Sequence, residues 1–149
     1  MENNSKQYRH DLLFMDQAIR LSQMSFAVRK KVGAILVKDN VLIASGWNGM
    51  PRNFPNACEL PDGTTNPLVV HAETNIFMNC LRQGCDSIKG ATIYVTLSPC
   101  SNCVAAMIQT NIARVVYLEE YRIKDGIDIL KSANINIEQF KYPIKNGEI

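Results

Sequence analysis

Apolar residues recur with a helical period in the first part of the chain. Between Arg9 and Met24 they fall near a 3.6-residue stripe, which leaves out the polar residues of the same stretch. The stripe comprises Leu12, Leu13, Met15, Ile19 and Met24, and the polar residues outside it are Asp11, Asp16, Gln17 and Arg20. The pattern predicts an amphipathic helix over 9–24, with Asp11 outside its apolar face.

The next segment has the pattern of a β-hairpin. Residues 32–37 are almost continuously apolar, which is typical of a strand covered on both faces. Lys38-Asp39-Asn40 has the composition of a turn, and residues 41–47 predict the returning strand. From 48 to 70 the periodicity stops, and glycine, proline and asparagine interrupt the chain repeatedly. An irregular stretch of this length within a compact domain indicates a functional loop or a lid.

The second half predicts alternating helices and strands. The expected elements are a helix from about His71 to Gln83 that ends at Gly84, a strand over 91–97, a helix from Ser98-Pro99 to Asn111 with Pro99 in its first turn, a strand over 112–118, a helix over 126–132 and a strand over 135–140. Strand–helix–strand repeats imply parallel pairing through right-handed crossovers. The fold class is therefore α/β.

Length and charge narrow the classes of function. A chain of 149 residues predicts a single domain, 1–149, with a sizeable core. The net charge of +2 is too small to favour binding of a long nucleic acid, and no apolar run is long enough for a membrane span. The N-terminal residues lack the apolar segment of a signal peptide, and the cysteine count of five is odd, so we expect a cytoplasmic protein with reduced thiols.

Two short motifs carry the candidate chemistry: His71-Ala72-Glu73 and Pro99-Cys100-Ser101-Asn102-Cys103. One imidazole and two thiolates suit Zn²⁺, and three protein ligands leave a fourth position open for water, as catalytic zinc sites do. Glu73, two residues from His71, can move protons without binding the metal. This combination is the signature of zinc-dependent nucleobase deaminases. Zinc would activate a water as nucleophile, and Glu73 would transfer protons to the ring and to the departing amine.

Other interpretations of the cysteines remain open. Cys100 and Cys103 could form a redox pair, although this leaves His71 and Glu73 without a role. A structural zinc site needs a fourth ligand, for which Cys58 is the best candidate. The remaining cysteines, Cys80 and Cys85, are expected to be ordinary buried or half-buried thiols, and His10 is expected to be a solvated helix residue.

Four blocks resemble the cytidine deaminase superfamily and, within it, the deoxycytidylate (dCMP) deaminases. The blocks are Val32-Gly33-Ala34-Ile35-Leu36-Val37, Gly46-Trp47-Asn48-Gly49-Met50-Pro51, His71-Ala72-Glu73-Thr74-Asn75 and 90–103. The second block is typical of the dCMP branch. The resemblance implies a cytidine-deaminase-like fold, a three-layer α/β/α arrangement with a five-stranded mixed sheet. It also implies hydrolysis of dCMP to dUMP and ammonia, which supplies dUMP for thymidylate synthesis.

The resemblance assigns roles to further residues. Asn48 would contact the substrate sugar, the backbone of Ala72 would meet the pyrimidine carbonyl, the carbonyl of Ser98 would accept from the departing amino group, and Tyr121 would line the nucleotide pocket. Asn48 could instead be a turn residue, and Tyr121 a surface ring. For the 5′-phosphate, Arg29 and Arg52 are candidates on position alone, and either could be a solvated surface residue.

The resemblance also concerns metal content and partners. Some phage relatives carry a second, structural zinc, but the residues for it are missing here, so we expect one Zn²⁺ per chain. Relatives are commonly hexamers or other homo-oligomers, and many are activated by dCTP and inhibited by dTTP. The long loop is shorter than in the relatives with two zinc ions.

Two rival functions remain. The first is another zinc deaminase, acting on tRNA adenosine, free cytosine or a riboflavin-pathway pyrimidine. A tRNA enzyme would need a more basic surface. The second is a zinc-stapled nucleotide-binding module without turnover, for which Glu73 would be dispensable.

Overall fold

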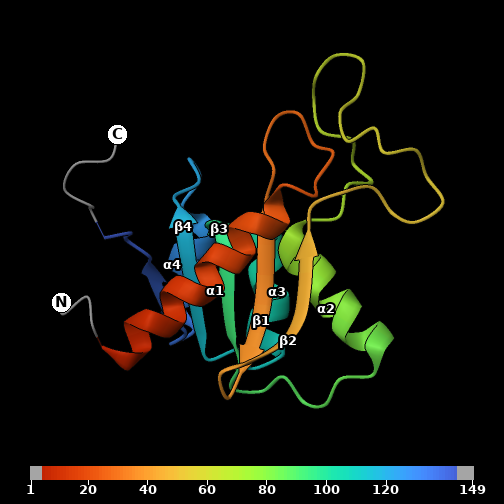
Figure 1. Ribbon diagram of the computed structural model, residues 1–149. Coiled ribbons are helices and arrows are strands. Elements are labelled where there is room, and N and C mark those ends of the chain that lie inside the picture. The colour runs from red at the N-terminus through yellow and green to blue at the C-terminus, as the bar shows by residue number, and fades with distance from the viewer. Residues whose placement is uncertain (1–4, 144–149) are drawn as a thin grey trace.

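The computed structural model describes residues 5–143 and contains nine elements in the order helix, two strands, then alternating helices and strands (Figure 1). They are α1 (Lys6–Ser22), β1 (Gly33–Lys38), β2 (Val41–Trp47), α2 (Ala72–Gln83), β3 (Thr92–Leu97), α3 (Ser101–Gln109), β4 (Arg114–Glu119), α4 (Asp125–Ser132) and β5 (Asn136–Gln139). No helix within residues 5–143 has both the length and the apolar composition that a membrane span requires.

The strands form one mixed sheet in the order β2-β1-β3-β4-β5. β1 pairs antiparallel with β2 and β3, whereas β3, β4 and β5 are parallel, as the strand–helix alternation predicted. The hairpin between β1 and β2 turns at Asp39 and Asn40, both with positive φ, which matches the right-handed twist of the two strands.

Helices cover both faces of the sheet, and each face has its own apolar core. Helix α1 lies across one face, where its side chains pack with Ile35, Tyr94 and Val116 (Figure 1). Helices α2, α3 and α4 lie on the other face, over Leu36, Ile93 and other sheet residues. Because β1 is buried on both faces, its sequence is almost continuously apolar. The predicted three-layer α/β/α fold with a five-stranded mixed sheet is confirmed.

The predicted apolar stripe of α1 is wrong in part. The helix begins and ends earlier than predicted, and Leu13 and Met24 are about half exposed (49% and 57%). Asp11, expected outside the apolar face, is instead buried at 6% exposure. The physical reason is a partner distant in sequence: the Arg114 guanidinium binds both carboxylate oxygens of Asp11, each at 2.7 Å.

Two local predictions also need correction. Helix α3 begins at Ser101, with Cys100 as its N-cap, so Pro99 precedes the helix and does not lie in its first turn. Cys80 and Cys85 are joined as a disulfide, where ordinary thiols were expected. Gly84 ends α2 in a left-handed conformation and turns the chain back, which brings Cys85 to Cys80 across the helix terminus. His10, expected to be a solvated residue, is half-buried, and the centre of its ring lies 6.2 Å from that of Phe14.

Candidate active site

Three side chains converge where the first turns of α2 and α3 meet. His71 is the N-cap of α2, Cys100 is the N-cap of α3, and Cys103 is the third residue of α3. The Nδ1 atom of His71 lies 3.5 Å from Sγ of Cys100 and 3.4 Å from Sγ of Cys103, and the two sulfur atoms are 3.5 Å apart. Among residues 5–143, this is the one place where three or more side chains able to bind a metal come together.

The distances between these three ligand atoms fit a tetrahedral Zn²⁺ site. Zinc–sulfur bonds of about 2.3 Å and a zinc–nitrogen bond of about 2.0 Å place tetrahedral ligand atoms roughly 3.5–3.8 Å apart. The observed separations of 3.4 and 3.5 Å lie close to that range. His71 is exposed whereas Cys103 is buried, so the ligands enclose the metal position from the protein side and leave it open outward. The candidate fourth ligand of a structural site, Cys58, is not part of this group.

The two thiols share one negative charge: Cys100 is the thiolate, and the hydrogen bond to Cys100, burial and the charge of Glu73 raise the pKa of Cys103. Both cysteines lie at the N-terminus of α3, where the partial positive charge of the helix favours thiolates. The neighbouring thiol of Cys103 and the imidazole of His71 lower the pKa of Cys100 strongly. Hydrogen bonding to Cys100 in turn raises the pKa of His71. A Zn²⁺ ion would displace the shared protons and hold both sulfurs as anions.

Glu73 lies beside the metal ligands but does not join them. It is the second residue of α2 and is only 4% exposed. Its Oε2 lies 3.9 Å from Sγ of Cys103. Burial raises the pKa of Glu73 to about 7, although the positive charge of His71 partly opposes this. A carboxyl group with this pKa can accept and release a proton near neutral pH.

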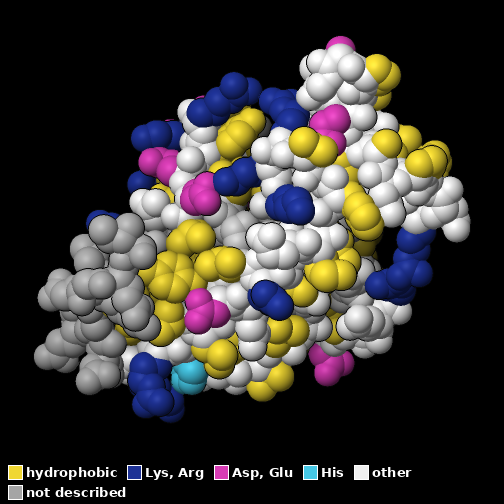
Figure 2. All heavy atoms as spheres, turned by 45° about the horizontal axis from the view of Figure 1, so that its top comes forward, with side chains coloured by type: hydrophobic (Ala, Val, Ile, Leu, Met, Phe, Trp, Pro, Cys, Tyr) yellow, Lys and Arg dark blue, Asp and Glu magenta, His cyan; other side chains and the backbone are white. Residues whose placement is uncertain are grey.

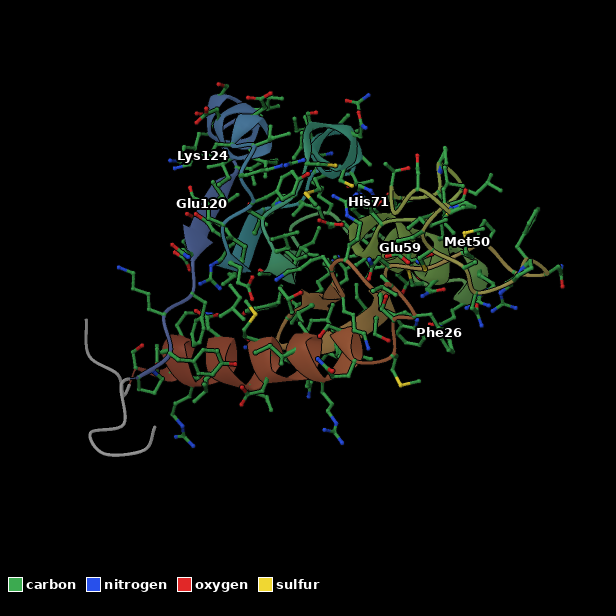
Figure 3. The ribbon with its side chains drawn as sticks, turned by 90° about the horizontal axis from the view of Figure 1, so that it is seen from above. Phe26, Met50, Glu59, His71, Glu120 and Lys124 are labelled. Carbon is green, nitrogen blue, oxygen red and sulfur yellow. A yellow bond between two sulfur atoms is a disulfide. The ribbon has the colours of Figure 1, made fainter. Side chains whose placement is uncertain are left out.

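A cavity of about 320 Å³ opens onto these residues. Its volume lies at the lower end of the range for small-molecule sites. The wall includes five of the residues expected to meet a nucleotide, namely Asn48, Ala72, Ser98, Tyr121 and Arg29, together with Glu73, His71 and Cys100. Figure 3 shows the site from above, with His71 next to the loop that carries Glu59 and Met50.

Arg52 is the site candidate that the structure does not bring to the cavity. It is exposed on the long loop and does not line the wall. Three charged residues that sequence analysis missed do line it: Lys30, Glu59 and Arg122. Lys30 pairs with Glu119 at the end of β4, and the Arg122 guanidinium lies 6.0 Å from the centre of the Tyr121 ring. The positions of Lys30 next to Arg29 and of Arg122 next to Tyr121 were usable signals, but nothing local identifies Glu59.

Asn48 and Ser98 are already engaged in the protein itself. The amide of Asn48 accepts a hydrogen bond from the Val32 N–H at 2.8 Å and donates one to the Lys30 carbonyl at 2.9 Å. The hydroxyl of Ser98 accepts from the Tyr121 N–H at 2.7 Å. Both side chains therefore fix the backbone around the cavity, whatever further contact they make.

Comparison with known proteins identifies the family. The model of the cytidine and deoxycytidylate deaminase zinc-binding region matches residues 8–119. The deoxycytidylate deaminase of Enterobacteria phage T4 is 33% identical, over 87% of this chain and 88% of the phage protein. The chain belongs to the cytidine and deoxycytidylate deaminase family, whose zinc-binding region includes the group of His71, Cys100 and Cys103.

Two further relatives belong to the deoxycytidylate branch. The deoxycytidylate deaminase of Saccharomyces cerevisiae is 32% identical over 89% of this chain, which spans only 45% of the yeast protein. A crystal structure of the dCMP deaminase of cyanophage S-TIM5, in complex with dCMP and dUMP, superposes with a TM-score of 0.85 and 40% identity. The match covers 91% of this chain and 98% of the cyanophage chain.

Proposed function

We propose that this chain catalyses the zinc-dependent hydrolytic deamination of dCMP to dUMP and ammonia. The observation that carries the proposal is the buried carboxylate of Glu73 beside an outward-facing group of His71, Cys100 and Cys103, at the base of a nucleotide-sized cavity. The similarity to the cyanophage dCMP deaminase, whose structure contains substrate and product, supports dCMP as the substrate. The dUMP formed would supply thymidylate synthesis.

The reaction needs a nucleophile and two proton transfers. A Zn²⁺ ion held by His71, Cys100 and Cys103 would supply a water of lowered pKa. Glu73 takes a proton from the attacking water and delivers it to N3 of the cytosine ring as the oxygen bonds to C4. Glu73 then takes the remaining proton from the hydroxyl group on C4 and passes it to the amino group, so that the C4–N bond breaks, ammonia leaves and the C4 carbonyl of dUMP forms. Burial suits Glu73 to this role, since a carboxyl group with a pKa of about 7 exchanges protons in both directions at neutral pH.

The cavity wall offers a partner for each part of the nucleotide. The N–H of Ala72 lies in the first turn of α2, where helical N–H groups have no partner within the helix, and it donates to the pyrimidine carbonyl. The carbonyl of Ser98 accepts from the departing amino group, and Tyr121 packs along the nucleotide. Asn48 contacts the sugar through the amide hydrogen that is not bound to Lys30. Arg29 binds the 5′-phosphate, and Arg52 has no part in it because it lies outside the cavity wall.

The proposal extends to assembly and regulation. We propose a homo-oligomer, a hexamer being the form common among relatives, activated by dCTP and inhibited by dTTP. Exposed apolar side chains on and around the loops support self-association, among them Phe26 at 65% and Val28 at 85% exposure. Figure 2 shows hydrophobic side chains on the loops and also over the rest of this face. The enzyme acts in the cytoplasm, where charged nucleotides are retained because they do not cross membranes unaided.

A substrate panel tests the proposal. Purified, zinc-loaded protein is incubated separately with dCMP, deoxycytidine, CMP and dCTP, and the loss of cytosine absorbance is followed. We expect fast turnover of dCMP and at least tenfold lower kcat/KM for the other three, which is about 1.4 kcal/mol of transition-state discrimination. The dCMP reaction is repeated with dCTP or dTTP, which should raise and lower the rate. A zinc-loaded protein that turns over none of the four would contradict the proposal.

A further inference from the structure

The carboxylate of Glu59 holds a segment of the chain far from it in sequence. Its Oε1 atom accepts hydrogen bonds from two consecutive backbone N–H groups, of Val28 at 2.8 Å and of Arg29 at 3.0 Å. Glu59 lies on the long irregular loop, 31 and 30 residues away from these partners. Within residues 5–143 the carboxylate forms no ion pair, so its charge is directed at these two N–H groups. Hydrogen bonds to an ionised acceptor are roughly twice as strong as neutral ones.

The segment that Glu59 holds belongs to no regular element. Residues 23–32 connect α1 to β1 and lie in neither a helix nor a strand. The side chain of Asn48 fixes the far end of this connection, through the Lys30 carbonyl and the Val32 N–H. The hydroxyl of Ser25 fixes the near end, since it accepts from the Ala27 N–H and donates to the Asn48 carbonyl. Glu59 holds the middle, at Val28 and Arg29, the part of the connection that leads into the cavity wall.

Two of the three Lys and Arg side chains that line the cavity lie on this connection, and the third is Arg122. Arg29 and Lys30 both line the cavity, as does Glu59 itself. Lys30 is paired with Glu119, whereas Arg29, the other cation of this connection that lines the cavity, has no ion-pair partner among residues 5–143. In the view of Figure 3, Glu59 lies between His71 and the stretch that carries Phe26. The Arg29 side chain extends from a backbone position that Glu59 holds.

We propose that Glu59 is a positioning residue for the 5′-phosphate: by fixing the backbone of Val28 and Arg29, it aims the Arg29 guanidinium at the phosphate and so gives the enzyme its preference for a nucleotide over a nucleoside. This inference rests on the proposed function, because it assumes that dCMP occupies the cavity. Glu59 touches no reacting atom. Its loss should weaken phosphate binding without slowing the chemical step.

The test compares Glu59→Ala with Glu59→Gln, which keeps an oxygen able to accept from both N–H groups. Asp62→Ala is the matched control, since Asp62 lies on the same loop and its carboxylate binds Thr64 alone. KM and kcat for dCMP, kcat/KM for deoxycytidine and zinc content are measured for each protein. For Glu59→Ala we expect KM for dCMP to rise by about tenfold, which corresponds to losing about 1.4 kcal/mol of binding. Its kcat, its zinc content and its kcat/KM for deoxycytidine should stay within about twofold of wild type.

Glu59→Gln should restore KM to within about threefold of wild type or lower it, because the side chain still accepts both hydrogen bonds and no longer repels the phosphate. An unchanged KM in Glu59→Ala would overturn the inference. Equal losses for dCMP and deoxycytidine, or a loss of zinc, would overturn it too, because they would show a general structural role. A wild-type protein without dCMP turnover refutes the proposed function itself, whereas an active wild type with an unaffected Glu59→Ala refutes this inference alone.

Discussion

Glu73 differs from the exposed acidic residues of the chain in both position and ionisation. Its carboxylate is almost completely buried, lies next to Cys103, and has a pKa that burial raises to about 7. A carboxyl group in water would be ionised at neutral pH and would be a poor proton donor. The protein environment therefore makes one side chain suitable for both halves of the proton transfer.

The substitution Glu73→Gln should lower kcat for dCMP by at least about 100-fold, because an amide can neither accept nor release the proton. Zinc content should be unchanged, since Glu73 does not belong to the metal-ligating group. Steady-state kinetics and metal analysis of the purified variant check this. Glu120→Gln is the control, as that carboxylate pairs with Lys124 outside the cavity wall. Full activity in Glu73→Gln would rule out its role in catalysis.

Helix α1 is joined to the sheet by an ion cluster as well as by apolar packing. Asp11 on α1 accepts from Tyr94 Oη on β3 at 2.7 Å and from both terminal nitrogens of Arg114 on β4. Arg114 also pairs with Glu138 on β5. The cluster is mostly shielded from water, with side-chain exposures of 16% for Arg114 and 9% for Asp11. Removal of Asp11 therefore leaves the Arg114 guanidinium with the more exposed Glu138 as its remaining ion-pair partner.

Asp11→Ala should lower the free energy of unfolding by about 3 kcal/mol. This value is at the lower end of the range for breaking a buried ion pair, because Glu138 still pairs with Arg114 in the variant. Denaturant unfolding at neutral pH measures this, and Asp86→Ala, at an exposed position, provides the control. A change below about 0.5 kcal/mol, as is usual for a surface site, would show that the cluster contributes nothing.

The same cluster predicts how stability depends on pH. Burial tends to raise the pKa of Asp11, but hydrogen bonds from Arg114, Tyr94 and Gln7 outweigh it and lower the pKa below its ordinary value. The stabilisation is therefore present above the unfolded pKa, at about pH 4, and is lost as the pH falls through the lowered folded pKa. Unfolding measured from pH 7 to pH 2.5 should show a smaller acid loss in Asp11→Asn than in wild type. Equal losses in the two proteins would contradict this assignment.

Helix α4 supports the metal-binding motif through a position that has no side chain. A Cβ atom at Gly126 would overlap the carbonyl group of Pro99, directly before the ligand Cys100. The first turn of α4 therefore lies against the backbone that presents Cys100. The atoms that a methyl group at Gly126 would meet belong to the backbone of Pro99 and Cys100 and not to a flexible side chain. Either α4 or this backbone must therefore move.

Gly126→Ala should lower the free energy of unfolding by about 1–3 kcal/mol, as overpacking of a buried contact does, and should weaken zinc binding. Competition with a chromophoric chelator measures the affinity for zinc. Asp128→Ala, an exposed position on the same helix, should leave zinc affinity unchanged. If Gly126→Ala binds zinc as tightly as wild type, α4 does not determine the position of Cys100.

The whole active site lies at one end of the sheet, the upper end in Figure 1. Asn48 follows β2, Ser98 and Cys100 follow β3, and Tyr121 follows β4. This is the edge of an open α/β sheet at which the carboxyl ends of parallel strands and the helix N-termini meet, and where ligands bind in such folds. The zinc ligands join the starts of α2 and α3, two segments that the sheet already places side by side.

Removal of zinc should abolish activity but leave the sheet folded, because one apolar core contains no zinc ligand and the other, which includes Cys103, consists mainly of apolar side chains away from the metal group. Treatment with a strong chelator is expected to preserve the far-UV circular dichroism at 25 °C and to lower Tm by at least about 5 °C, since zinc binds the native state preferentially. Readdition of zinc should restore both activity and Tm. Complete unfolding of the metal-free protein would show that the metal is part of the folding core.

The sequence was sufficient to predict the fold class and the metal group for the same physical reason. The ligands and Glu73 come as two short motifs, each within one helical turn, and the alternation of strands and helices brings those turns to one edge. Local spacing therefore contained the information. The irregular stretch 48–70 was also correctly predicted, and it supplies part of the cavity wall.

What could not be predicted depends on partners distant in sequence. Asp11 was assigned to the polar side of its helix because Arg114 lies 103 residues away. Glu59 showed no local sign of its contact with Val28, 31 residues earlier. The Cys80–Cys85 disulfide was missed because its formation depends on the turn that Gly84 makes at the end of α2. Pairings of this kind arise from the folded arrangement and not from the period of the sequence.

The most direct measurement is the conversion of dCMP by protein that carries a known amount of zinc. Metal-free protein is titrated with Zn²⁺, and formation of dUMP and ammonia is followed at each addition. Our account predicts that both products form in equal amounts and that the rate rises linearly until about one zinc per chain is bound, then stays constant. Zinc bound at one equivalent without formation of dUMP would contradict it, as would full activity in the metal-free protein.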